Sequence, residues 1–158
     1  GMIENKHVTW CPSYGPEMRG GTANCSVVIS DELVGSPLIS HDATAAVIMN
    51  LPSLTKFEKD ILPGGVLLIN SSLIEKKSER DDIKVAYVEA NKIAGDLGNS
   101  RAANMVMLGA LLSLDNIVSF ESIQQAFIKV FGERKKEFLP GNEKALNAGA
   151  ESVKGLIS

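Results

Sequence analysis

Short apolar runs alternate with polar and glycine-rich stretches through the first half of the chain. Several of these runs are apolar at nearly every position, which is typical of strands covered on both faces of a sheet. The pattern predicts strands over residues 6–11, 24–30, 45–51, 65–70 and 84–89.

A helix is predicted between the third and fourth of these strands. Leu54, Phe57 and Ile61 recur at helical spacing, and Ser53 is the expected N-cap. The run Pro63-Gly64-Gly65 then breaks the chain before the next strand. The pattern therefore predicts a strand-helix-strand unit.

The second half of the chain has the periodicity of helices. A short helix follows the strand at 84–89, and Gly98 is expected to end it in a left-handed conformation. Residues 100–114 are apolar almost all round behind a Ser100 cap, which predicts a helix buried between other elements. Residues 121–131 are amphipathic, and a last helix is expected from Asn142 onward, with Pro140-Gly141 as a loop before it.

Alternating strands and helices followed by helices favour a three-layer α/β/α domain with a largely parallel sheet. A length of 158 residues fits a single domain over residues 1–158. Residues 31–40 are ambiguous, and a short hairpin strand is expected at 33–39.

Composition and charge narrow the class of protein. Hydrophobic residues make up 44% and charged residues 22%, as in ordinary globular proteins. No apolar run approaches the roughly 18 residues of a spanning helix, and the first residues lack the apolar core of a secretory signal. The net charge of -3 comes with no basic stripe. We therefore expect a cytoplasmic protein with neither a membrane nor a nucleic acid as partner.

The chain has two cysteines, Cys11 and Cys25, and no CxxC motif. An iron-sulfur cluster generally takes four thiolates, so this chain alone is not expected to hold a cluster or another metal. Both thiols are expected to be reduced and in or near the core, because free cysteine is among the most buried residue types.

The decapeptide SYGPEMRGGT, residues 13–22, is the main candidate for binding chemistry. Its glycines give the backbone freedom to approach a ligand, and it follows a strand, where open α/β sheets bind ligands. Arg19 beside two glycines suits an anion, and Glu17 would orient the guanidinium. The alternative is a tight turn with a solvated Glu17–Arg19 pair. Trp10 and Tyr14 are either surfaces for stacking on a nucleotide base or core residues.

Residues 10–39, WCPSYGPEMRGGTANCSVVISDELVGSPLI, resemble the signature region of the gamma subunits of 2-oxoacid:ferredoxin oxidoreductases. These enzymes act on pyruvate, 2-oxoisovalerate and 2-oxoglutarate. The same order of similar segments continues along the chain, at Gly64-Gly65, LG at 97–98, AANMVMLGAL at 102–111 and NEKALNAG at 142–149. The resemblance also implies a fold like that of domain III of pyruvate-ferredoxin oxidoreductase.

The resemblance implies a part in a larger enzyme. In such complexes thiamine diphosphate supports decarboxylation, iron-sulfur clusters pass electrons to ferredoxin, and coenzyme A takes the acyl group. The gamma subunit closes over the active site and contributes to coenzyme A binding. Its expected partners are the alpha and beta subunits and a ferredoxin-like delta subunit. The isolated chain, holding no cofactor of its own, is expected to be inactive.

The resemblance also carries over particular residues, although it assigns them no individual task. The asparagine of the buried helix, Asn104, has the alternative of a buried amide bonded to neighbouring backbone. The positions matching the family pattern are Ser13, Tyr14, Gly15, Glu17, Arg19, Gly20, Gly21, Thr22, Asn24 and Asn104.

One departure from the family pattern leads to a further expectation. Family members usually begin about 20 to 30 residues earlier, with a strand, a GxGGQG-like loop and a helix. Without a central βα unit, backbone groups and an apolar face would be left uncovered. We therefore expect the isolated chain to self-associate.

Two other functions remain open from the sequence. One is the small subunit of the related indolepyruvate oxidoreductase, which would act on aryl pyruvates. The other, from a different class, is a stand-alone domain that binds a small molecule or nucleotide, which a thermal-shift titration with coenzyme A would reveal.

Overall fold

A computed structural model of the chain describes residues 1–14, 23–36, 39, 41–132 and 137–155. The strands are β1 (His7–Tyr14), β2 (Ala23–Ser30), β3 (Ala43–Ile48), β4 (Ile61–Asn70) and β5 (Lys84–Val88). The helices are α1 (Leu51–Phe57), α2 (Ala90–Asp96), α3 (Ala103–Leu114), α4 (Phe120–Phe131) and α5 (Leu139–Ser152). Short 3₁₀ turns are η1 (Met2–Glu4), η2 (Glu58–Asp60) and η3 (Ser100–Ala102).

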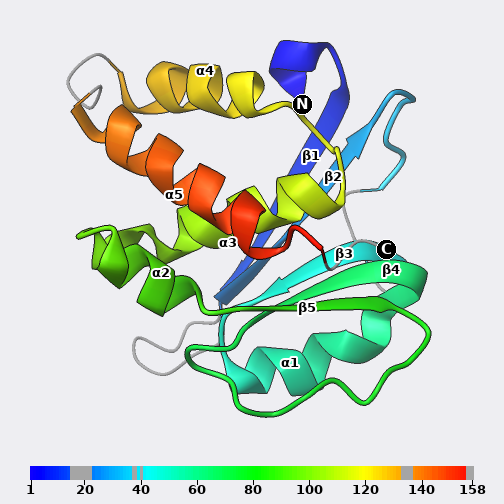
Figure 1. The fold of residues 1–158 in the computed structure, drawn as a ribbon. Coiled ribbons are helices and arrows are strands. Elements are labelled where there is room, and N and C mark those ends of the chain that lie inside the picture. The colour runs from blue at the N-terminus through cyan, green and yellow to red at the C-terminus, as the bar shows by residue number, and fades with distance from the viewer. Residues whose placement is uncertain (15–22, 37–38, 40, 133–136, 156–158) are drawn as a thin grey trace.

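The centre of the fold is a three-stranded parallel sheet in the order β3-β4-β5. Helix α1 covers one face of the sheet, and the layer containing α2, α3 and α5 covers the other (Figure 1). The predicted three-layer α/β/α class is therefore confirmed. The predicted strand-helix-strand unit is also confirmed, as β3, α1 and β4.

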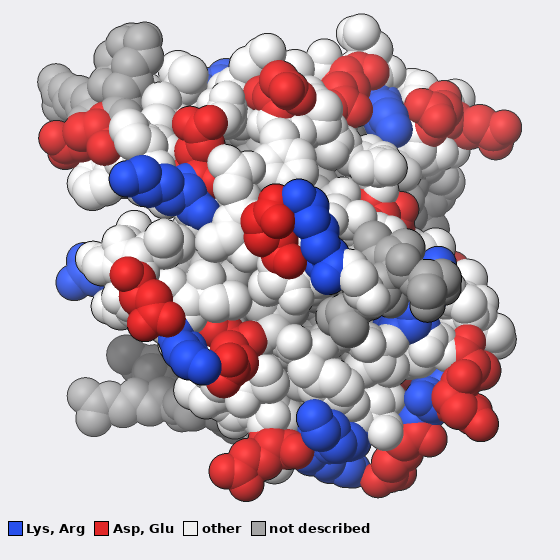
Figure 2. Space-filling model, in the orientation of Figure 1, with Lys and Arg blue, Asp and Glu red and all other residues white. Residues whose placement is uncertain are grey.

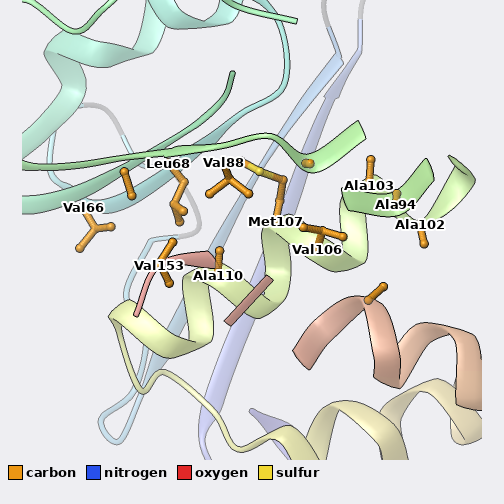
Figure 3. Close-up of a cluster of buried hydrophobic side chains, with 13 residues drawn as sticks. Val66, Leu68, Val88, Ala94, Ala102, Ala103, Val106, Met107, Ala110 and Val153 are labelled. Atoms are coloured by element: carbon orange, nitrogen blue, oxygen red, sulfur yellow. The ribbon is translucent and has the colours of Figure 1, made fainter. Parts of the chain in front are cut away.

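The middle strand, β4, is buried on both faces. Leu67 and Ile69 belong to the core under α1, whereas Val66 and Leu68 belong to the core under α3 and α5 (Figure 3). Successive side chains of a strand point to opposite faces, so a strand between two helical layers must be apolar throughout. This explains the continuous apolar run at 66–69.

The N-cap predicted for α1 was wrong by three positions. Asn50, not Ser53, is the capping residue, and its side chain accepts a hydrogen bond from the Ser53 amide at 2.9 Å. Asn50 has extended backbone angles and Pro52 stands in the first turn, where the lack of an N–H costs nothing. Ser53 is therefore buried inside the helix.

The first two predicted strands lie outside the parallel sheet. β1 and β2 pair only with each other, antiparallel, from His7 opposite Ser30 to Tyr14 opposite Ala23. A parallel pair would need a crossover of about a dozen residues or more, and the connection 15–22 is shorter than that. Figure 1 shows these two strands as a separate ribbon outside the parallel sheet.

The boundaries of the later helices differ from the predictions at their starts. Ser100 is not a cap, because α3 begins at Ala103 after the turn η3 and no side chain caps it. Pro140 and Gly141 lie within α5, whose first turn tolerates proline. Gly98 does have the predicted left-handed conformation, with φ of 73°.

The short strand expected at 33–39 is not formed by residues 33–36, which are irregular.

The long connection between β4 and β5 is fastened to the start of β4 by Arg80. The Arg80 guanidinium donates to the carbonyl oxygen of Ile61 at 2.6 Å and to that of Glu58 at 3.1 Å. The same guanidinium forms two bonds to the Asp82 carboxylate, at 2.6 and 2.7 Å. This geometry matches the planar donor fork of arginine and holds the irregular segment against the sheet.

Helices α3 and α5 meet at backbone contact. A Cβ atom added to Gly109 would stand 1.9 Å from the carbonyl oxygen of Leu146, and one added to Gly149 would stand 1.9 Å from that of Val106. The two glycines thus lie reciprocally against the opposite helix. Only residues without a side chain permit this approach, which places Val106 and Ala110 in the core beside Val153 (Figure 3).

Replacing either glycine by alanine is expected to destabilise the domain. In Gly109→Ala and Gly149→Ala the new methyl group meets rigid backbone, so the helices must separate, at a cost of about 1–3 kcal/mol or more. Denaturant unfolding followed by circular dichroism measures the effect. Gly95→Ala is the matched control, because Gly95 is exposed on α2 with nothing within 4 Å of an added Cβ. The control should be neutral or more stable by up to about 1 kcal/mol. Equal midpoints for all three variants would contradict the close contact.

Glu4 ties the start of the chain to α4. Its carboxylate accepts a hydrogen bond at 2.7 Å from the amide of Ser119, the residue whose side chain caps α4. This backbone hydrogen bond is the main cause that lowers the pKa of Glu4 from 4.5 to about 2, and hydrogen bonds from the hydroxyls of Ser122 and Ser119 add to it. Lys6 donates to the Ile117 carbonyl oxygen at 3.2 Å. The segment leading into β1 is therefore held at the N-terminus of α4.

The stabilisation by Glu4 is expected to depend on pH. Because folding lowers its pKa, the carboxylate stabilises the fold fully above about pH 4.5, and the effect is lost as the pH falls through about 2. Glu4→Gln should therefore lower the melting temperature at pH 7 and make little difference near pH 2. Glu75→Gln is the control, since Glu75 is exposed in the connection after β4, away from any helix terminus. A melting temperature at pH 7 equal to that of the control would rule out this role.

Candidate functional site

The decapeptide singled out in the sequence is anchored by the ends of the ribbon. Tyr14 pairs with Ala23, and Ser13 pairs with Asn24. Ser13 is exposed and Asn24 is half-buried. The remaining candidate residues, Gly15, Glu17, Arg19, Gly20, Gly21 and Thr22, lie outside the residues that the structure describes.

The position of this segment in the fold differs from the prediction. It was expected at the carboxyl end of a strand in an open parallel sheet, where α/β folds bind ligands. The structure shows that the strands on either side form an antiparallel hairpin. The candidate segment therefore joins two strands that pair with each other outside the parallel sheet.

Asn104 does not fit the alternative of a buried amide. Helix α3 is largely buried, as predicted, but Asn104 is exposed on it. Among the described elements, α3 and the two ribbon strands make no extensive contact. A role for Asn104 in binding stays a prediction.

The two cysteines lie on opposite faces of the ribbon. Cys11 is opposite Ser26, and Cys25 is opposite Pro12, so the two positions differ by one step in the alternation of the strands. Cys11 is half-buried and Cys25 is exposed, so the expectation of a core position was wrong for Cys25. Two thiols that point apart do not fit an iron-sulfur cluster. In the described part of the chain no three His, Cys, Asp or Glu residues gather as metal ligands would.

Trp10 is not a core residue. Its side chain is 66% exposed, next to the exposed Val27 on the neighbouring strand. The core alternative for Trp10 was therefore wrong, whereas stacking on a nucleotide base stays a prediction. Exposed aromatic residues are common where a protein binds a partner or ligand.

The carboxyl edge of the parallel sheet carries a polar network that sequence reasoning missed. Asn70 ends β4 with no exposed surface, and its amide nitrogen donates to the Asn91 side-chain oxygen at 2.8 Å. The Asn70 side-chain oxygen accepts from the Ser72 amide, and the Ser72 hydroxyl accepts from the amides of Asn91 and Lys92. The signal was the polar run Asn70-Ser71-Ser72 directly after a buried strand. These bonds close the turn after β4 against the start of α2.

The amino edge of the same sheet is hollowed. An open cavity of about 320 Å³ lies between the start of β3, the glycine pair of β4 and the start of β5. Lys84 and Asp115 supply its charges, and Gly64 and Gly65 supply exposed backbone. Figure 2 shows acidic and basic residues interspersed on the face in view. The described helices include none long and apolar enough to span a membrane.

Comparison with known proteins identifies first the fold of the chain and then its family. The three-layer domain superposes on the gamma subunit of a keto/oxoacid ferredoxin oxidoreductase from Geobacter sulfurreducens with a TM-score of 0.77 and 30% identity, covering 98% of this chain and 84% of that one. The family model of pyruvate ferredoxin/flavodoxin oxidoreductases matches residues 1–152. The chain therefore belongs to this family, which confirms the resemblance seen in the sequence.

Two similar proteins come from methanogens. Ketoisovalerate oxidoreductase subunit VorA of Methanothermobacter thermautotrophicus is 40% identical over 94% of this chain, and the match spans 30% of VorA. 2-Oxoglutarate synthase subunit KorC of Methanocaldococcus jannaschii is 37% identical over 80% of this chain and 68% of KorC. This chain thus corresponds to under a third of VorA and to about two thirds of KorC.

Two of the family-like segments have a structural role. The segment 102–111 contains Gly109, and the segment 142–149 contains Gly149. These are the glycines at which α3 and α5 touch. Part of the family pattern therefore records how two helices cross, and the signal in the sequence was a glycine within each otherwise regular helix.

Removing the side chain of Asn70 is expected to destabilise the sheet edge. Asn70→Ala removes the hydrogen bonds to the exposed Asn91 and the half-buried Ser72, at a cost of about 0.5–1.5 kcal/mol each. Urea unfolding gives the difference in the free energy of unfolding. Asn116→Ala, at an exposed position, is the control and should change it by less than about 0.5 kcal/mol. Indistinguishable urea midpoints for the two variants would show that the network is not stabilising.

Proposed function

We propose that this chain acts as the gamma subunit of a 2-oxoacid:ferredoxin oxidoreductase. The complex would convert a 2-oxoacid to carbon dioxide and an acyl-coenzyme A, and ferredoxin would take the electrons. The observation that carries the proposal is the family match over residues 1–152, supported by the 37% identity to KorC over two thirds of that protein. The cytoplasm is the compartment that fits such a complex.

The cofactors of the reaction are assigned to other subunits. Thiamine diphosphate would supply the decarboxylation chemistry, and iron-sulfur clusters would carry the electrons, on alpha, beta and ferredoxin-like delta subunits. The thiol count supports this division, because the two cysteines of the chain lie on opposite faces of the ribbon. This chain would complete the active site and help to bind coenzyme A.

The residues assigned to coenzyme A are those between the ribbon strands. Arg19 would donate to a phosphate or carboxylate, together with the amides of Gly20 and Gly21. The paired ends Ser13 and Asn24 support this assignment, because an antiparallel pair fixes both ends of the segment at one place. Ser13 is exposed there. Tyr14, Gly15, Glu17 and Asn104 complete the candidate set.

Complex formation is the first test of the proposal. A tagged copy of the chain, expressed in its native host, should co-purify with subunits that hold thiamine diphosphate. The purified complex should reduce ferredoxin only when both a 2-oxoacid and coenzyme A are present. Purification of the chain without such subunits, or a complex without this activity, would overturn the proposal.

Arg19→Ala is expected to weaken coenzyme A binding in that complex. Loss of a hydrogen bond to a charged group costs about 1.5–3 kcal/mol, which corresponds to a rise in KM for coenzyme A of about tenfold or more. Initial rates at varied coenzyme A and at varied 2-oxoacid separate the two substrates. Lys59→Ala, an exposed position on η2, is the control and should leave both KM values unchanged. Unchanged KM values and turnover in Arg19→Ala would exclude the assigned role of Arg19.

A further inference from the structure

The Gly64-Gly65 pair lies in a bulge at the amino edge of the parallel sheet. Between two successive register pairs, β3 has the single residue Thr44, whereas β4 has the four residues 62–65. A Cβ added to Gly65 would stand 2.8 Å from the carbonyl oxygen of Thr44 and 2.9 Å from that of Leu62. Gly64 has a φ of 80°, so both positions favour glycine. Bulges are over-represented beside active sites, where they redirect the chain.

The bulge borders the open cavity of about 320 Å³ at this edge of the sheet. Sites for small molecules have volumes of roughly 300–1,000 Å³, so the cavity is large enough for a small ligand. Leu62 of the bulge and Leu114 at the end of α3 give the wall apolar surface. Leu62 is 40% exposed, so a ligand with an apolar part would remove its side chain from water.

Two opposite charges line the same cavity. Lys84 begins β5, and Asp115 is the C-cap residue of α3. In the described part of the chain, neither forms an ion pair. A ligand with only a negative charge would be attracted by Lys84 and repelled by Asp115, and a ligand with only a positive charge would meet the reverse. An apolar ligand would take water from both charges without replacing it. A ligand that carries both charges satisfies both side chains.

We propose that this cavity binds a small zwitterion, an α-amino acid with an apolar side chain. The ligand carboxylate accepts a hydrogen bond from Lys84, and the ligand ammonium group donates to the carboxylate of Asp115. The apolar side chain of the ligand lies against Leu62 and Leu114, which supply the apolar part of the wall. The proposal rests on the cavity alone and not on the enzymatic assignment.

Titration of the isotope-labelled chain with L-leucine, followed in its amide NMR spectrum, tests the proposal. The amides of Gly64, Gly65 and Asp115 should shift and saturate, with a dissociation constant of about 1 mM or tighter. Isocaproate lacks the ammonium group of leucine, and isoamylamine lacks the carboxylate. Each of these two analogues should bind at least about tenfold more weakly than leucine, because each leaves one charge of the cavity without a partner.

Substitution of either charged residue gives a second test. Lys84→Met and Asp115→Asn should each weaken leucine binding by about tenfold or more, because each leaves one charge of the ligand unpaired. Lys129→Met on α4 and Asp96→Asn on α2 are the matched controls, since both residues are exposed on helices that do not line the cavity. The controls should bind leucine as the unsubstituted chain does.

The comparison of leucine with its two analogues needs no variant, so it decides the proposal even if a substitution prevents folding. An amide spectrum without saturable shifts up to about 20 mM leucine would overturn the proposal. Equal affinity for leucine and isocaproate would do the same, and so would unchanged leucine binding in a folded Lys84→Met chain.

Discussion

The two hydrophobic cores of the domain meet at one strand. β4 gives Leu67 and Ile69 to the core under α1, and it gives Val66 and Leu68 to the core under the other helices. Neither helical layer can bury its apolar side chains without this strand, and the strand in turn needs both layers. The turn after β4 is closed by the buried Asn70, and Arg80 fastens the following connection to the start of the strand. The polar contacts of Asn70 and Arg80 therefore fix the two ends of β4.

The glycine contact between α3 and α5 follows from the same constraint. α3 is apolar almost all round because it lies between the sheet and α5. Gly109 and Gly149 bring the backbones of α3 and α5 into contact where the two helices cross. At this short separation a side chain as small as that of Ala145 is enough to fill the core between the helices. The glycines in these two family-like segments therefore have a role in packing.

The parts of the fold that could be predicted are those in which a single local feature of the sequence determines the structure. Apolar periodicity located the strand-helix-strand unit, and the left-handed preference of glycine located the end of α2 at Gly98. The N-caps predicted at Ser53 and Ser100 were wrong. Asn50 caps the start of α1, and the turn η3, which contains Ser100, precedes the start of α3. The antiparallel ribbon was missed because pairing depends on partners distant in space, although the short connection 15–22 was a usable clue. In the candidate site, the structure places Ser13 and Asn24, at the ends of the two ribbon strands. The exposure of Asn104 could not be predicted, because it depends on how α3 is rotated against the sheet. Periodicity does not determine that rotation in a helix that is apolar almost all round.

The proposed coenzyme A segment begins and ends on the two strands of the β1–β2 ribbon, so its ends are held only as firmly as these strands are paired. In the proposed role, Arg19 would hold a phosphate well only if the strands on either side kept their register, because a slip by one residue would move every side chain to the other face. A ribbon of two strands has few hydrogen bonds to resist such a slip, and Gly1 lies against its base, at Val8 and Ile29. Over the middle of the ribbon, Trp10 and Val27 lie opposite each other and are exposed, so their side chains add little packing against the rest of the domain. The register at the candidate segment therefore depends mainly on the backbone pairing of β1 with β2.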